Sequence, residues 1–121
     1  MRIRRARQLL KSLADDTRLR IVNILKKGEL NVSELCRTLG TSQSNISKHL
    51  TRLRLTGIVN DKRRGLNVYY YLREPETKVH AELVRAITAG LRELEIFRKD
   101  ALRLEDFKRK TKRLKAAGKR R

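Results

Sequence analysis

Residues 41–53 most strongly limit what this chain can fold into. Ile46, Leu50 and Leu53 recur at the spacing of one face of an α-helix. A very short link beginning at Gly40 joins this segment to an earlier helical pattern, which predicts a helix-turn-helix. The opposite face carries hydroxyls, amides and cations but no carboxylate, and such groups suit phosphate oxygens and base edges in a DNA major groove. An ordinary amphipathic surface helix is the alternative, which the missing acids and the neighbouring segments disfavour.

The charge balance supports a polyanionic partner. The 121 residues include 32 Lys and Arg against 13 Asp and Glu, a formal net charge of +19. Tryptophan is absent and aromatic residues make up 4%, so anchors for a membrane surface are scarce. No apolar run approaches the ~20 residues that span a bilayer. A single cysteine cannot form an internal disulfide and no signal peptide is recognisable, so we expect a cytoplasmic protein without membrane contacts.

Three helices are expected before the 41–53 segment. The first covers residues 1–13, and the second runs from a cap at residues 15–17 to about residue 27. The third covers residues 32–39 and ends at Gly40. Together with the 41–53 segment, these helices account for most of a small hydrophobic core.

The hydrophobic period changes from that of a helix to that of a strand over residues 58–72. Apolar and polar side chains alternate toward its end, which predicts a β-hairpin with residues 61–65 as its polar turn. The tip would carry Lys62, Arg63 and Arg64. A solvated hairpin is the alternative, but its position directly after a basic helix favours a wing that contacts DNA.

A long apolar stripe follows Pro75, which suits the first turn of a helix running through residue 94. We expect its surplus apolar face to pack against a second copy of the chain, against the first helix, or against both. The residues expected at a dimer contact are Leu10, Leu83, Ile87, Leu91 and Leu94. Residues 1–106 would form the domain, and residues 107–121 a basic, disordered tail that either adds phosphate contacts or only solvates the chain.

Five motifs then follow one another in a recognisable order and spacing. They are L-A-D-D-T-R-L-R-I-V-N-I-L, V-S-E-L-C, S-Q-S-N-I-S-K-H-L, L-T-G-I-V and V-Y-Y-Y-L. Over about residues 7–95 the chain thereby resembles the ArsR/SmtB family of transcriptional repressors. The resemblance implies a mainly α (α+β) winged helix-turn-helix with four helices, a hairpin and a last helix. It also implies a homodimer, joined through its first and last helices, that represses transcription at a palindromic operator and responds to an effector, here unidentified.

The residues expected to contact double-stranded DNA lie on the 41–53 helix and the hairpin. By the resemblance, Gln43 and Ser44 contact bases or phosphates, whereas His49 either packs within the domain or contacts a phosphate. The predicted set is Ser42, Gln43, Ser44, Asn45, Ser47, Lys48, His49, Arg52, Lys62, Arg63, Arg64 and Asn67. An architectural DNA-binding protein with little sequence preference is the alternative function. An enzyme is not expected, because the sequence has no phosphate-binding loop and no catalytic constellation.

The sequence departs from the metal-sensing members of that family. Their E-L-C-x-C signature is matched at Cys36, but Thr38 replaces the second cysteine, and thiophilic ions need two or three thiolates. His80 lacks the neighbouring ligands of a zinc site and is expected to pack near the dimer helix. We therefore expect no metal and no cofactor. Cys36 is expected at the edge of the core, with a thiol sensor as the alternative.

Overall fold

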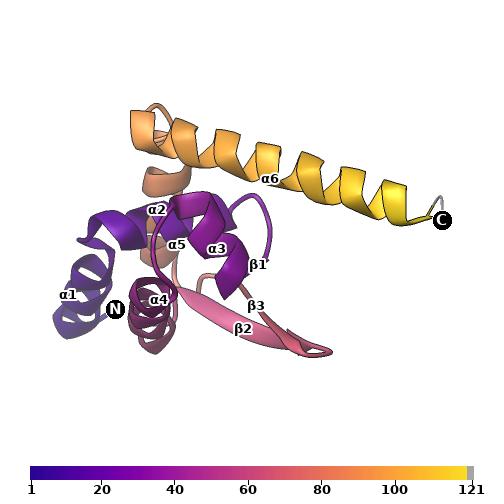
Figure 1. Cartoon of the computed structure of the whole chain (residues 1–121). Coiled ribbons are helices and arrows are strands. Elements are labelled where there is room, and N and C mark those ends of the chain that lie inside the picture. Colours follow the sequence, from indigo (N-terminus) through magenta and orange to yellow (C-terminus); the bar gives the residue numbers. More distant parts are fainter. Residues whose placement is uncertain (120–121) are drawn as a thin grey trace.

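Four helices, with a two-residue strand between the second and the third, precede a β-hairpin, and two further helices and a π-helical turn follow it (Figure 1). This computed structural model describes residues 1–119. The helices are α1 (Ile3–Leu13), α2 (Asp16–Leu25), α3 (Val32–Leu39), α4 (Gln43–Leu55), α5 (Lys78–Arg85) and α6 (Glu95–Lys119), with the π-helical turn η1 (Ala86–Gly90) after α5. The strands are β1 (Leu30–Asn31), β2 (Val59–Arg64) and β3 (Asn67–Leu72). The predicted mainly α (α+β) class is confirmed.

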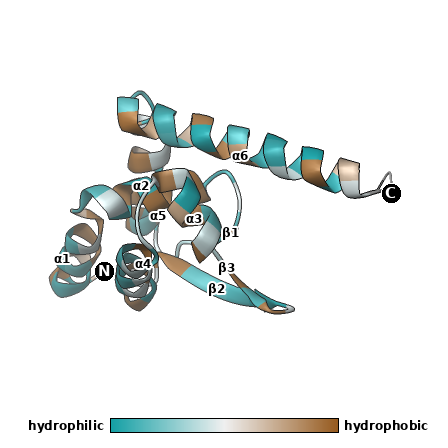
Figure 2. Cartoon of the chain, in the orientation of Figure 1, coloured by the Kyte–Doolittle hydropathy of each residue, from teal (hydrophilic) through white to brown (hydrophobic). Residues whose placement is uncertain are grey.

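The hydrophobic core forms where α2, α3 and α4 meet. The α4 stripe of Ile46, Leu50 and Leu53 is almost fully buried, as its spacing predicts, and it packs with residues such as Ile24 of α2 and Leu35 of α3. In Figure 2 hydrophobic residues concentrate on α2 and α3, whereas α6 is mostly hydrophilic. Burial of this stripe turns the polar face of α4 toward solvent.

A tight turn joins α3 to α4 and confirms the predicted helix-turn-helix. Gly40 adopts a left-handed conformation (φ 66°), and its N–H donates to the carbonyl of Cys36 at 2.8 Å. A Cβ atom at this glycine would lie 3.2 Å from Nη1 of Arg103 on α6. Ser42 then caps α4 by accepting a hydrogen bond from the backbone N–H of Asn45. The direction of α4 is therefore set by its first residues.

The sheet has three strands in the order β1-β3-β2, whereas the sequence predicted a two-stranded hairpin. Strand β1 pairs antiparallel with β3, and Leu30 lies opposite Tyr70. Its two residues are too few to show an alternating pattern. Strand β2 continues to Arg64, so the expectation of a polar turn over residues 61–65 was wrong; the chain reverses at Gly65 (φ 61°) and Leu66.

The expected single helix from Pro75 to Leu94 is interrupted. Thr77 caps α5, which starts at Lys78, three residues after Pro75, and not at Pro75 itself. At η1 the N–H of Leu91 bonds to the carbonyl of Ala86 at 3.0 Å, five residues earlier in the chain. The chain then turns before α6 begins. This interruption brings α6 back across α2 and α3 (Figure 1).

Helix α6 is held to the core by a buried ion pair. The Asp100 carboxylate is fully buried and accepts hydrogen bonds of 2.9 and 2.8 Å from Nε and Nη2 of Arg20. The same guanidinium donates to the carbonyl of Leu39 at the end of α3. Phe97 and Leu104 are buried on the same helix. One arginine thus connects α2, α3 and α6.

We expected a disordered tail from residue 107, but α6 crosses that boundary and continues to Lys119. Asp106 pairs with Lys110 at 3.0 Å, an i,i+4 contact that supports helix, and Arg37 of α3 stacks on Phe107. Residues 120–121 of the expected tail lie outside the described residues. None of the described helices is both long and apolar enough to cross a membrane.

Candidate nucleic-acid interface

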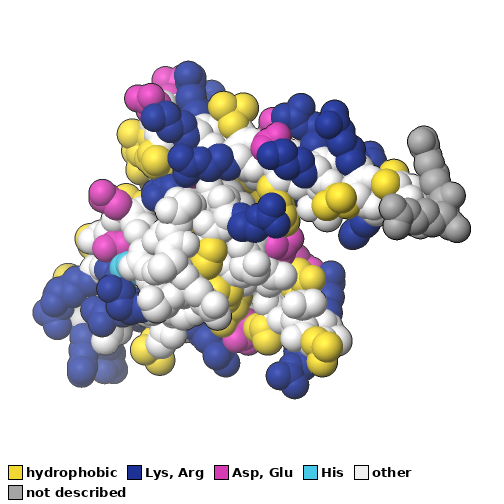
Figure 3. Space-filling model, in the orientation of Figure 1, with side chains coloured by type: hydrophobic (Ala, Val, Ile, Leu, Met, Phe, Trp, Pro, Cys, Tyr) yellow, Lys and Arg dark blue, Asp and Glu magenta, His cyan; other side chains and the backbone are white. Residues whose placement is uncertain are grey.

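The exposed face of α4 carries the predicted polar residues. Gln43, Ser44, Ser47, Lys48 and Arg52 are all exposed, and residues 43–55 contain no acidic side chain. Figure 3 shows Lys and Arg side chains gathered over α1 and along α6, with others at the hairpin. The exposed face of α4 therefore presents hydroxyl, amide and cationic groups, and the surface around it also carries positive charge.

Two of the predicted contact residues stabilise the start of α4. The Asn45 side chain is half-buried, and its Nδ2 donates to Oγ1 of Thr41 at 2.9 Å. The exposed Ser42 hydroxyl accepts the capping hydrogen bond described above. Both side chains stabilise the turn before α4, so part of their hydrogen-bonding capacity is already occupied within the chain.

His49 does not belong to the exposed face, and the prediction that it contacts DNA is contradicted. Its side chain is buried, with Nδ1 3.1 Å from Nη1 of Arg18 and 3.6 Å from Oδ2 of Asp15. Burial lowers the pKa of His49, and the Arg18 guanidinium lowers it further, which favours neutral imidazole. The sequence contained the signal, because position 49 is three residues after Ile46 and therefore lies on the apolar stripe.

The β2–β3 hairpin, called the wing from here on, carries the predicted cations on β2. Lys62, Arg63 and Arg64 are exposed, and Asn67 is exposed opposite Arg64. Within residues 1–119, Arg63 makes no ion pair, whereas Lys62 and Arg64 both pair with Glu29. The sequence did not single out Glu29, because it lies far from the hairpin along the chain.

A further ion pair connects the wing to α4. Nη1 of Arg54, on the last turn of α4, lies 3.2 Å from Oδ2 of Asp61 on β2. At the same end of α4, Nη2 of Arg5 donates to the carbonyl of Thr56 at 2.8 Å, and the hydroxyls of Ser12 and Thr56 lie 2.8 Å apart. These contacts connect α1, α4 and the wing, so the two candidate DNA-contacting elements have a defined relative position.

The setting of the thiol on α3 does not favour its reactive form. Cys36 is half-buried beside the core, and burial raises the pKa of its thiol, which disfavours the reactive thiolate. Thr38, at the position of the family's second cysteine, is fully buried, and its hydroxyl has no hydrogen-bond partner among the described residues. Residues 1–119 contain no group of three or more His, Cys, Asp or Glu side chains arranged to hold a metal ion.

The residues expected at a dimer contact fall into two groups. Leu10, Leu91 and Leu94 are exposed within this single chain. Leu83 packs against the core, and Ile87 is buried in it, so Ile87 is unavailable to a partner. For Ile87 the alternative of packing within the chain therefore applies. The interruption at η1 explains the difference, because it turns this part of the stripe toward α2.

We expect the folded state to lose stability as the pH falls below about 6.5, the usual histidine value. Burial lowers the pKa of both His49 and His80, and Nε2 of His80 has no hydrogen-bond partner among the described residues. The unfolded chain therefore binds more protons than the folded chain in this range, so the free energy of unfolding decreases as the pH decreases. Thermal melts from pH 7.5 to 5 measure this.

His80→Gln should flatten that pH dependence, because glutamine does not titrate. A variant with the same pH dependence as the original protein would contradict the assignment to His80.

Helices α2 to α4 with a basic wing define a winged helix-turn-helix protein of the DNA-binding class. The family model for bacterial regulatory proteins of the arsR family matches residues 15–61. The arsenic resistance transcriptional regulator ArsR1 of Pseudomonas putida is 39% identical over 105 residues, which span 82% of this chain and 77% of that protein. The chain therefore belongs to the ArsR family. It is a DNA-binding transcriptional regulator and not an enzyme, as predicted.

Solved structures show the same arrangement. Reduced HlyU from Vibrio cholerae superimposes with a TM-score of 0.60 at 38% identity, covering 71% of this chain and 90% of that one. The transcriptional repressor BigR from Xylella fastidiosa superimposes with a TM-score of 0.61 at 34% identity, covering 74% and 88%. These similarities confirm the predicted winged helix-turn-helix.

Proposed function

We propose that this chain is a homodimeric repressor that binds a palindromic operator through α4 and the wing. The observation that carries the proposal is the exposed, acid-free face of α4 beside the cationic β2 strand, on the fold of an ArsR-family regulator. Duplex DNA matches both parts, since base edges form hydrogen bonds with polar side chains and phosphates form ion pairs with cations.

Exposed apolar side chains support a dimer. Ile3 and Leu10 on α1, and Leu91 and Leu94 between η1 and α6, are all more than a third exposed. Contiguous exposed apolar patches usually mark a contact with another protein, and each of these two pairs is proposed to lie in such a contact. A two-fold axis would place two α4 helices in successive major grooves, roughly 34 Å apart along the DNA.

The position and charge of each residue indicate whether it would contact bases or phosphates. Gln43 and Ser44 at the start of α4 would reach base edges, because the first residues of a recognition helix approach the groove most closely. Lys48, Arg52 and the wing cations would neutralise phosphates and release counterions. An amide can form two hydrogen bonds to an adenine edge, so Gln43 is the proposed main source of sequence preference.

The side chains of α3 do not favour a soft ion as the effector of this chain. Soft ions such as arsenite need two or three thiolates in one site. This chain has one cysteine, and the position of the family's second cysteine is a buried threonine, Thr38. The proposed function is therefore regulation of transcription through an effector other than a metal held by that cysteine pair.

Footprinting on the DNA upstream of the chain's own gene tests the proposal. We expect a protected, symmetric site, with two chains bound per site in analytical ultracentrifugation. Fluorescence anisotropy at about 150 mM salt should show at least ~10³-fold tighter binding to that site than to scrambled DNA. Equal affinity for both DNAs would favour an architectural protein, and a monomer on the DNA would contradict the two-fold arrangement.

A further inference from the structure

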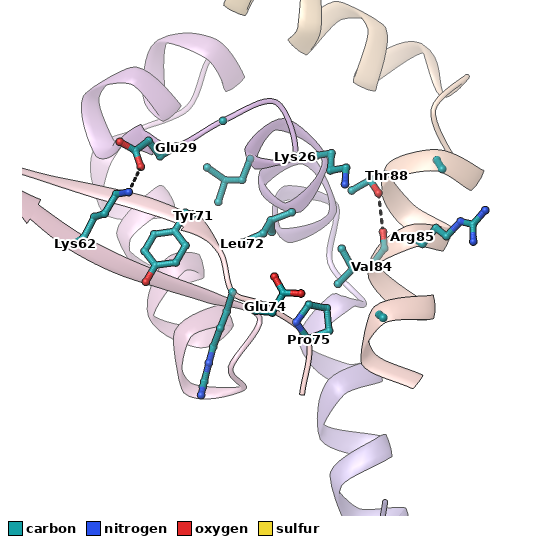
Figure 4. Close-up of a pocket in the computed structure, with 15 residues that line it drawn as sticks. Lys26, Glu29, Lys62, Tyr71, Leu72, Glu74, Pro75, Val84, Arg85 and Thr88 are labelled. Carbon is teal, nitrogen blue, oxygen red and sulfur yellow. Dashed lines mark hydrogen bonds and ion pairs between the residues drawn. The ribbon is translucent and has the colours of Figure 1, made fainter. Parts of the chain in front are cut away.

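One carboxylate holds two of the three cations of the wing. Oε2 of Glu29 lies 2.6 Å from Nζ of Lys62, and Oε1 lies 2.5 Å from Nη1 of Arg64. Figure 4 shows the Glu29–Lys62 pair at one edge of a cavity of about 690 Å³ between the wing and α5. Glu29 belongs to the link between α2 and β1, so the contact joins the helical core to the wing.

The strand geometry explains why these two cations meet one acid. Residues two apart on a strand share a face, so Lys62 and Arg64 point to the same side of β2 and Arg63 to the other. Tyrosines on β3 lie beneath both cations, at 5.4 Å for Lys62 over Tyr71 and 5.8 Å for Arg64 over Tyr69. The hydrogen bond from Lys62, aided by the charge of Arg64, holds the pKa of Glu29 below its usual range.

We propose that Glu29 competes with DNA phosphates for Lys62 and Arg64, and so sets how much of the charge of the wing is available to DNA. This rests on the proposed function and adds a residue that determines affinity without touching DNA. Lys62 and Arg64 are 44% and 61% exposed, so a phosphate can approach both while they are paired. A carboxylate and a phosphate oxygen accept the same hydrogen bonds from these donors.

The competition has a measurable consequence. Each phosphate that a protein neutralises contributes about 0.9 to the slope of log K against log salt. With Glu29 in place, Arg63 can bind a phosphate directly, whereas Lys62 and Arg64 must first break their ion pairs with Glu29. Without the carboxylate, up to two more cations can pair with phosphates, which would steepen the slope by up to ~1.8.

Glu29→Gln tests the proposal, with Glu76→Gln as the matched control. Both changes remove one negative charge, and among residues 1–119 Glu76 pairs only with Arg73, at 2.8 Å, outside the wing. In anisotropy titrations at low salt, Glu29→Gln should tighten binding about three- to tenfold, the scale of two exposed ion pairs. It should also steepen the salt slope, whereas Glu76→Gln should change both only slightly.

A second set of variants localises the effect. Lys62→Gln together with Arg64→Gln should abolish the gain from Glu29→Gln, whereas Arg63→Gln should leave that gain intact. Thermal melts establish that each variant is folded.

Two results would overturn the proposal. Weaker DNA binding by Glu29→Gln would show that Glu29 positions the wing for DNA. Equal changes in affinity and salt slope for Glu29→Gln and Glu76→Gln would show that only the net charge of the protein matters. Either result, with the original protein still selecting its own upstream site, leaves the proposed function standing. If the original protein binds no DNA, the proposed function fails and this inference fails with it.

Discussion

Replacing Asp100 with alanine is expected to lower the free energy of unfolding by about 3–5 kcal/mol. The carboxylate is 0% exposed, and its partner Arg20 is 17% exposed, so the variant would leave a largely buried guanidinium without its counter-charge. A guanidinium keeps its charge in proteins, so Arg20 cannot become neutral when the carboxylate that accepts its hydrogen bonds is removed. Urea unfolding followed by circular dichroism measures the loss, and helix content at low denaturant reports whether α6 has detached.

Asp106→Ala on the same helix is the control. Asp106 is exposed and pairs with Lys110 at the surface, so its removal should hardly change the unfolding midpoint. An Arg20→Met, Asp100→Leu double variant should recover much of the stability, because apolar residues of similar volume often replace a buried ion pair without loss. Similar small effects of Asp100→Ala and Asp106→Ala would contradict the role given to the buried pair.

Gln43→Ala is expected to weaken binding to the operator about 5- to 150-fold, the equivalent of the 1–3 kcal/mol of a good base contact. Binding to scrambled DNA should change little, because non-specific binding depends on phosphate contacts, and glutamine carries no charge. The Gln43 side chain is exposed at the first turn of α4, where a recognition helix meets base edges. Anisotropy titrations of the two DNAs in the same salt measure the difference.

Gln8→Ala provides a matched control, since Gln8 is an exposed glutamine on α1. It should leave both affinities unchanged. Equal losses for Gln43→Ala on operator and scrambled DNA would count against a base-reading role and would assign the residue to phosphate contact.

Local patterns were sufficient for most of the parts proposed to face DNA. The apolar spacing along α4 placed Ile46, Leu50 and Leu53 inside and Gln43 and Lys48 outside, and the structure agrees. The same rule places His49, three residues after Ile46, on the buried side, which is one of the two positions expected for it. The change to a period of two residues indicated β2 and β3, although the reversal at Gly65 was placed too early in the chain.

Local patterns failed where the structure depends on distant partners. The apolar stripe after Pro75 continues through η1 without a break in spacing, so the spacing in that stretch does not predict that the helix ends. The two-residue strand β1 exists only because β3 lies beside it. The basic end of α6 is a helix where composition indicated disorder, because its first half is docked on α2 and α3.

The sequence by itself determined which faces of each element would be apolar, which would be cationic, and to which family of regulators the motifs point. These properties depend on residues within a few positions of one another, where periodicity and capping act. Only the tertiary structure decided how charges pair: Asp100 with Arg20 across 80 positions, and Glu29 with two cations of the wing. Such pairs depend on how the elements pack in space, and spacing along the chain carries no record of that packing.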